Sequence, residues 1–168
     1  MSKQVINTGA TANDNTGDTL RASWQKANDN FTELYTDISA LNNATAYVPT
    51  LTDSGGGRTY TVTITSARYT EIGNLRWFTV SLSVTNATGV ASGSLRLSLP
   101  DSSTYAAAVC VQADGLAANA KTEIEGATLA GQAFAELVHY ENGSIDPLTS
   151  HVQTGSTLTV TGVYFHAA

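Results

Sequence analysis

Residues 59–85 read TYTVTITSARYTEIGNLRWFTVSLSVT, and apolar and polar side chains alternate along most of this stretch. Within it, residues 60–64 (YTVTI) and 78–84 (FTVSLSV) follow a strict period of two. This period places one set of side chains in a core and the other set in water. Gly73 and Asn74, between the two runs, are residues typical of a tight turn. The stretch therefore predicts two strands of an antiparallel sheet.

Further runs with a period of two follow toward the C-terminus, at residues 94–99, 107–113, 122–129, 133–140 and 157–165. Glycine, asparagine and proline separate these runs, as expected for turns. About 120 residues with eight or so short strands predict an all-β antiparallel sandwich, jelly-roll-like, over residues 46–168. The last run also carries Val163 and Phe165 on its outward side. Such a position favours either a contact between chains or cover by a loop.

Upstream of the sheet, the period becomes helical over residues 20–41, LRASWQKANDNFTELYTDISAL. Apolar residues alternate at spacings of four and three, which is a heptad pattern. They are Leu20, Trp24, Ala27, Phe31, Leu34, Ile38 and Leu41. Asp18 or Thr19 suits the N-cap of this helix. We therefore predict an α-helical coiled coil over residues 18–45, with these seven residues as the seam between associated chains, and the seam residues are compatible with either two or three chains.

Composition excludes several partners. The 168 residues include eight Lys plus Arg against fourteen Asp plus Glu, for a net charge of −6. A chain this acidic offers no basic surface for phosphates, so we expect no nucleic-acid partner. Its apolar runs are short and its N-terminus does not resemble a signal peptide, so we expect no membrane insertion.

Metal and cofactor sites are not expected. His139, His151 and His166 lie far apart in the sequence, although a symmetry axis can gather one histidine from each chain around an ion. The acidic turn at residues 13–18 lacks the glycine and glutamate spacing of a calcium loop. Cys110, in an apolar run, is predicted to be a small buried residue.

No catalytic residues are expected either. Glycan hydrolysis needs two carboxylates held across a groove. The acidic candidates are too sparse to define such a pair, and surface solvation is the better interpretation of Glu71, Glu123, Glu125, Glu136 and Asp146. The chain is therefore predicted to be non-enzymatic.

Aromatic residues give the remaining indication of binding. Trp77 lies on the polar side of its strand, and Tyr69, Tyr105 and Tyr140 lie near predicted strand ends. Rings in such places can stack on a sugar or anchor a protein partner. The alternative is that they cover an interface between chains.

The N-terminal third also carries a recognisable motif. Residues 5–9 read VINTG, 13–21 read NDNTGDTLR, 24–28 read WQKAN and 30–35 read NFTELY. This series resembles an N-terminal module of tailed-bacteriophage virion proteins, with Trp24 where that family usually has Phe. A looser similarity links PTLT at 49–52, RYTEIGN at 68–74, LSLP at 97–100 and GVY at 162–164 to the β-sandwich domain that ends many phage fibre proteins.

The resemblance implies a short trimeric tail fibre on the virion exterior. Residues 1–17 would be an extended docking arm, 18–45 a stalk and 46–168 a knob that contacts a host-surface glycan or protein. The docking residues it implies are Val5, Ile6, Asn7, Gly9, Asp14, Thr16, Gly17 and Asp18. The alternatives are a head fibre or decoration protein on the capsid or neck and, as a weaker one, a glycan-degrading tailspike.

Overall fold

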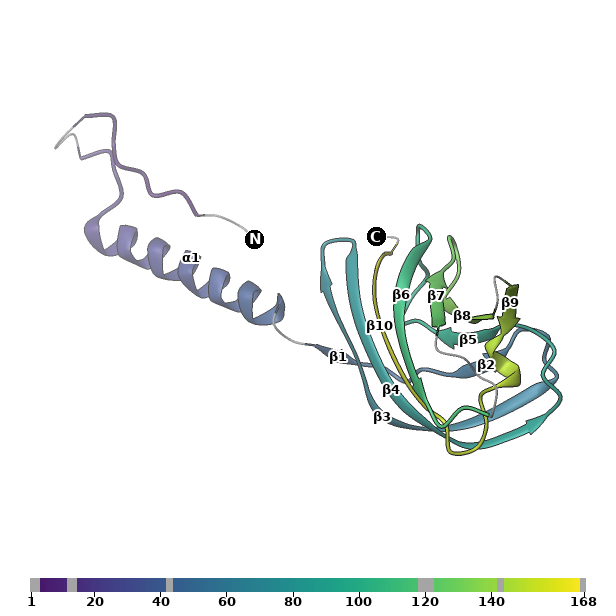
Figure 1. The fold of residues 1–168 in the computed structure, drawn as a ribbon. Coiled ribbons are helices and arrows are strands. Elements are labelled where there is room, and N and C mark those ends of the chain that lie inside the picture. Colours follow the sequence, from purple (N-terminus) through teal and green to yellow (C-terminus); the bar gives the residue numbers. More distant parts are fainter. Residues whose placement is uncertain (1–3, 12–14, 42–43, 118–122, 142–143, 167–168) are drawn as a thin grey trace. The chain divides into compact units, whose positions relative to one another are not determined.

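The computed structural model describes residues 4–11, 15–41, 44–117, 123–141 and 144–166 (Figure 1). Within these ranges, side chains at 40–41, 123, 140–141 and 144–147 are outside the description. The chain divides into two compact units, residues 1–43 and 44–168. Each unit is considered by itself below.

The first unit is built on one helix, α1 (Leu20–Leu41). Thr19 is its N-cap: the Thr19 Oγ1 accepts the amide of Ala22 at 3.3 Å, and the Thr19 carbonyl accepts the amide of Ser23 at 2.9 Å. Asp18, the other residue considered for the cap, uses its carboxylate elsewhere. A threonine hydroxyl at this position satisfies one of the amides that a helix start leaves unpaired.

The prediction of a coiled coil is wrong for the observed fold. A coiled coil requires at least two helices packed along a shared seam, and α1 is the one α-helix in the part of the chain that the structure describes. Five of its heptad residues, Leu20, Trp24, Phe31, Leu34 and Ile38, are exposed. The trimer that was predicted with it is not shown by this fold.

Ten strands and a short 3₁₀ helix make up the described part of the second unit (Figure 1). They are β1 (Thr45–Ala46), β2 (Leu51–Asp53), β3 (Arg58–Ile72), β4 (Leu75–Gly89), β5 (Leu95–Ser98), β6 (Ala107–Asp114), β7 (Glu123–Thr128), β8 (Phe134–Glu141), β9 (Ser144–Pro147), η1 (Leu148–Ser150) and β10 (Thr157–Phe165).

These strands form a closed barrel, which corrects the predicted sandwich. Eight antiparallel strands follow one another around the barrel in the order β3, β2, β5, β8, β7, β6, β10, β4, and β4 pairs again with β3. The remaining two strands pair at the side, β1 with β3 and β9 with β8. A sandwich would need two separate sheets, whereas here one sheet pairs with its own edge.

The reason for closure lies in the two longest strands, β3 and β4, of 15 residues each. Their register shifts between Thr61 and Val62 and again between Ile64 and Ser66. Such bulges bend a strand and increase its twist. The second one also changes the face that points inward: Ile64 faces the core before it, Ala67 after it, and Thr65 and Ser66 are both exposed. Bent, long strands let the sheet curl into a barrel.

The barrel interior is a single apolar core. Its central side chains are at most 1 % exposed and come from β4, β5, β8, β10 and the segment that begins with η1: Phe78, Val80, Leu82, Val84, Leu95, Leu97, Ala135, Leu137, Leu148, Val152, Leu158, Val160 and Tyr164. Gly162 faces this core on β10, and a Cβ there would lie 2.6 Å from Val109 and 2.8 Å from Phe78. The glycine therefore allows the barrel wall to pack closely against its own contents.

Candidate functional site

The N-terminal arm (residues 4–18) is not simply extended but turns back on itself. The Asp18 amide donates to the Asn7 carbonyl at 2.7 Å, and the Asn7 amide donates to the Asp18 Oδ2 at 2.9 Å. The Asn7 side-chain amide donates to the Thr16 carbonyl at 2.9 Å. A Cβ at Gly17 would lie 2.9 Å from the Asn7 carbonyl oxygen, so glycine permits this close approach.

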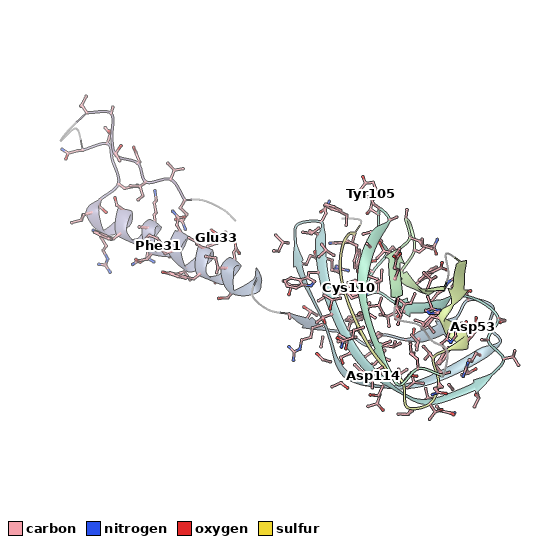
Figure 2. The ribbon with its side chains drawn as sticks, viewed as in Figure 1. Phe31, Glu33, Asp53, Tyr105, Cys110 and Asp114 are labelled. Carbon is pink, nitrogen blue, oxygen red and sulfur yellow. The ribbon has the colours of Figure 1, made fainter. Side chains whose placement is uncertain are left out.

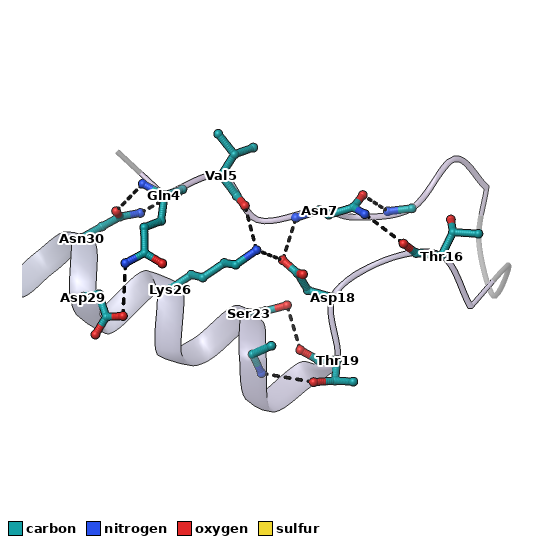
Figure 3. A network of polar contacts seen from close by, with 12 residues as sticks. Gln4, Val5, Asn7, Thr16, Asp18, Thr19, Ser23, Lys26, Asp29 and Asn30 are labelled. Atoms are coloured by element: carbon teal, nitrogen blue, oxygen red, sulfur yellow. Dashed lines mark hydrogen bonds and ion pairs between the residues drawn. The ribbon is translucent and has the colours of Figure 1, made fainter. Parts of the chain in front are cut away.

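Lys26 attaches the folded arm to α1 (Figure 3). Its Nζ donates to the Asp18 carboxylate at 2.6 Å and to the Val5 carbonyl at 3.1 Å. The Lys26 ammonium, followed by the Asn7 amide, holds the pKa of the Asp18 carboxyl below its ordinary value. One lysine thus joins the start of the arm, its end and the helix.

A second attachment lies one turn further along the helix (Figure 3). The Gln4 amide donates to the Asn30 Oδ1 at 2.9 Å, and the Asn30 Nδ2 donates to the Gln4 carbonyl at 3.0 Å. The Gln4 side chain also donates to Asp29 at 3.2 Å. We refer to Gln4, Val5, Asn7, Asp18, Lys26 and Asn30 as the arm–helix network.

This network covers the polar flank of α1 and leaves the apolar face of α1 (Leu20, Trp24, Phe31, Leu34 and Ile38) exposed. At about 100° per residue, Lys26 and Asn30 lie roughly a third of a turn away from the line of that face. Trp24 is 64 % exposed and Phe31, labelled in Figure 2, is 59 % exposed. Most helices of globular proteins turn their apolar face to a core and their polar face to water. In α1 this arrangement is reversed, because the apolar face is exposed and the arm–helix network lies on the polar flank.

Of the other two predicted seam residues, Ala27 is half-buried, and the Leu41 side chain lies outside the described residues. The predicted docking residues divide in a similar way. Asn7, Thr16, Gly17 and Asp18 come together within the folded arm, whereas the side chains of Val5 and Ile6 are exposed. Gly9 has a φ of 81°, and its amide donates to the Asn7 Oδ1. Asp14 lies outside the described residues.

The predicted receptor-contact aromatics whose side chains are described differ in exposure and in contacts. Trp77 is 61 % exposed on the outer face of β4, and Tyr105 (Figure 2) is 64 % exposed with its ring edge-on to Phe165. Tyr69 is partly buried, packs edge-on against Tyr47 and lies beneath the Arg76 guanidinium. The Tyr140 side chain is outside the described residues.

Two of the carboxylates considered for hydrolysis, Glu71 and Glu136, form ion pairs with arginines. Glu71 lies 2.5 Å from Arg76, and Glu136 lies 2.8 Å from Arg96. The Arg76 guanidinium holds the pKa of the Glu71 carboxyl below its ordinary value, which favours a permanently ionised group over a proton donor. Of the other candidates, Glu125 is exposed, and the side chains at 123 and 146 lie outside the description.

Two histidines that are distant in the sequence meet in the structure. The rings of His139 and His151 lie 5.0 Å apart between centroids, at 64°. His166 is buried beside Glu71, with 3.3 Å between its Nε2 and a carboxylate oxygen. No cluster of three or more potential metal ligands occurs among the residues whose side chains are described. Cys110 (Figure 2) is exposed, because β6 turns Val109 inward and the next residue outward; the prediction of a buried thiol was wrong.

Among the described segments, none forms a helix with both the length and the apolarity of a membrane span.

Comparison with known proteins identifies the chain. The sequence model of the family described as bacteriophage T4 gp9/10-like protein, N-terminal, matches residues 3–138. The comparison with curated proteins gives no match. Among solved structures, the chain is similar to the Dettilon tailspike protein (gp208), with a TM-score of 0.59 and 14 % sequence identity. That alignment covers 73 % of this chain and 23 % of the tailspike, and at such identity it shows a shared fold alone. Because the family match extends over well more than half of the residues, the chain belongs to the T4 gp9/10-like N-terminal family and is a phage virion fibre protein.

Proposed function

We propose that the chain is a non-enzymatic component of a short tail fibre, joined to the virion through its N-terminal unit and presenting its barrel to the host surface. The observation that carries this proposal is the exposed apolar face of α1 beside an arm that is fixed on the polar flank. A helix arranged in this way is ready to associate with copies of the same chain, and we propose a homotrimer. The arm is then held where a second virion protein can reach it.

The arm itself supports a docking role. Its backbone is fixed by the Asp18–Lys26 ion pair, while the side chains of Val5 and Ile6 remain exposed. An ordered backbone lowers the entropy that a partner must remove on binding. Two exposed apolar side chains on such a segment suit a small pocket on another virion protein.

We propose that the chain is not an enzyme because several of its described carboxylates are already engaged in ion pairs or hydrogen bonds. Glu71 and Glu136 are paired with arginines. Asp53 (Figure 2) accepts hydrogen bonds from the amides of Gly55, Arg58 and Ser92. These carboxylates act as structural acceptors. Incubation with host polysaccharide should release no reducing sugar, and release of sugar would favour a glycan-degrading tailspike.

Location on the particle tests the fibre assignment most directly. Cys110 is the only cysteine of this chain and lies exposed on the barrel, so purified chain that is labelled there with maleimide-linked gold and then assembled onto particles lacking the chain marks the barrel in virions. We expect the label on the tail. A label confined to the capsid or neck would overturn the tail-fibre proposal in favour of a head fibre or decoration protein.

Adsorption tests the host-facing role. Purified chain at saturating concentration should slow the adsorption of phage to host cells. Particles that lack the chain but adsorb at the normal rate would contradict this role.

A further inference from the structure

A pocket lies on the outer face of the β3–β4 hairpin, within the barrel unit. Across the hairpin, Thr70 is opposite Trp77 and Arg68 is opposite Thr79, so these four side chains form a compact block. The pocket has a volume of about 190 Å³ and is lined by Ala44, Arg68, Thr70, Trp77, Phe78 and Thr79. Pockets for drug-sized molecules measure roughly 300–1,000 Å³. The smaller volume of this pocket suits a ligand, or a part of a ligand, that consists of a single ring.

Trp77 gives the pocket a flat apolar wall. Its side chain is 61 % exposed although the barrel core is close by. The face of an indole matches the C–H face of a pyranose ring in size and apolarity. Thr70 and Thr79 place hydroxyl groups beside it, and the Thr79 Oγ1 lies 3.2 Å from the Thr161 Oγ1, which extends the row of hydroxyls onto β10. Such groups can exchange hydrogen bonds with sugar hydroxyls.

Arg68 differs from the other three arginines of the barrel. Arg76 and Arg96 each form an ion pair with a glutamate, and Arg58 donates a hydrogen bond to a backbone carbonyl. The Arg68 guanidinium makes no hydrogen bond or ion pair with the residues that the structure describes, and no acidic side chain lines the pocket. In a chain with a net charge of −6, an unpaired guanidinium beside a pocket favours an anionic ligand.

We propose that this pocket binds an acidic sugar, a pyranose that carries a carboxylate. Its ring stacks on Trp77, and its carboxylate accepts hydrogen bonds from Arg68. The inference rests on the proposed host-facing role of the barrel and gives that role a ligand class. It also assigns to Arg68 a function that the sequence pattern did not indicate.

Fluorescence of Trp77 tests the proposal in the full-length chain. The substitution Trp24→Phe leaves Trp77 as the single tryptophan. Titration with a glucuronic-acid oligosaccharide should give a saturable change in emission. A neutral glucose oligosaccharide should bind at least about 10-fold more weakly, because the charge-assisted hydrogen bonds are lost. Acetate alone should give no change, which separates sugar binding from binding of any carboxylate.

Two variants and two controls locate the site. Arg68→Gln should remove the preference for the acidic sugar, and Trp77→Ala should abolish binding measured by saturation-transfer NMR. Tyr105→Ala, which removes an equally exposed ring outside the pocket, and Arg21→Gln, which removes a cation from α1, should leave binding unchanged.

Three results would overturn the inference. The first is no fluorescence response to the acidic sugar, and the second is a loss of binding in Tyr105→Ala as large as that in Trp77→Ala. The third is protection of Trp77 from acrylamide quenching before sugar is added, which would show that another copy of the chain covers Trp77. Virions that carry Arg68→Gln distinguish a failure of the sugar-binding proposal from a failure of the tail-fibre proposal. If the gold label lies on the tail although the chain binds no sugar, the tail-fibre proposal stands and the sugar-binding proposal fails.

Discussion

The two units of this chain bury opposite kinds of side chain. In the barrel, Leu82, Leu97 and Leu137 are at most 1 % exposed, and the outward positions hold mainly threonine and serine. In the N-terminal unit, the covered residues are polar ones such as Lys26 and Asn30, whereas the apolar face of α1 is exposed. Burial of apolar surface is the dominant favourable contribution to folding. The barrel therefore contains its own source of stability, and we propose that the N-terminal unit gains its own from association.

Truncation of the barrel core should have the largest effect. Leu137→Ala removes a fully buried side chain and should lower the free energy of unfolding by about 2–5 kcal/mol. Urea denaturation followed by near-ultraviolet circular dichroism measures this change. Val90→Ala, at a position that is 80 % exposed, should change it little. If dilution of the wild-type chain shifts the urea concentration at which half of the barrel is unfolded, the stability of the barrel depends on association. That result would contradict the difference drawn here between the barrel and the N-terminal unit.

A charge on the apolar face of α1 should break association but leave the barrel intact. Leu34→Asp places an unpaired carboxylate in the proposed contact between copies, at a cost of about 3 kcal/mol and hence roughly a 100-fold weaker association. Sedimentation equilibrium measures the change. Thr36→Asp adds the same charge nearly on the opposite side of the helix and serves as the control. A wild-type chain that is monomeric at micromolar concentration would refute the proposed association.

Loss of Lys26 should release the arm. Lys26→Met keeps the length of the side chain but removes the bonds to Asp18 and to the Val5 carbonyl. The Asp18–Lys26 ion pair is only partly covered, so its loss should weaken the arm contact modestly. The amides of Asn7 and Asp18 should therefore exchange hydrogen measurably faster, while barrel amides keep their rates. Arg21→Met in the first turn is the matched control, and equal acceleration in both variants would remove the special role of Lys26.

Acidification should produce the smallest effect and confine it to the arm. The pKa of Asp18 lies below its ordinary value of 3.8 in the folded chain, because Lys26 and the Asn7 amide stabilise the carboxylate. The arm contact is therefore fully present above that ordinary value and is lost as the pH falls through the lower, folded value. The NMR shift of the Asn7 amide should follow this titration. In Asp18→Asn the shift should stay flat, and an unchanged titration there would assign it to another group.

Local periodicity explains what the sequence could predict. The heptad spacing indicated the helix that runs from Leu20 to Leu41, and alternation indicated every barrel strand longer than four residues. Closure could not be predicted in this way. At the bulge near Thr65 and Ser66, the inward-facing positions of β3 shift by one residue. From the sequence alone, this shift resembles a break between two shorter strands, whereas β3 is one long, bent strand. The period did not indicate the short strands β2 and β9, whereas it did indicate β5, a strand of four residues.

The candidate site shows the same limit. The motif of the arm indicated Asn7 and Asp18 as important residues, but not that they bind each other. The contact of Gln4 with Asn30 joins residues 26 positions apart through polar atoms, and no periodic pattern records such a pair. Cys110 was misjudged because its neighbours are apolar, although its position between the valines at 109 and 111 gave the correct orientation. Polar long-range contacts and strand phase require three-dimensional structure.

The position of β10 has a consequence for the way the chain is made. This strand is the last of the described strands to leave the ribosome, yet it lies between β4 and β6 and joins them. Until it is synthesised, both neighbours present an unpaired edge, and such edges invite pairing with other chains. The helix, by contrast, is complete early and is built from local contacts that form fast. In the oligomer proposed above, copies made side by side on one messenger would therefore meet through α1 before any barrel has closed, so the order of synthesis would guide assembly.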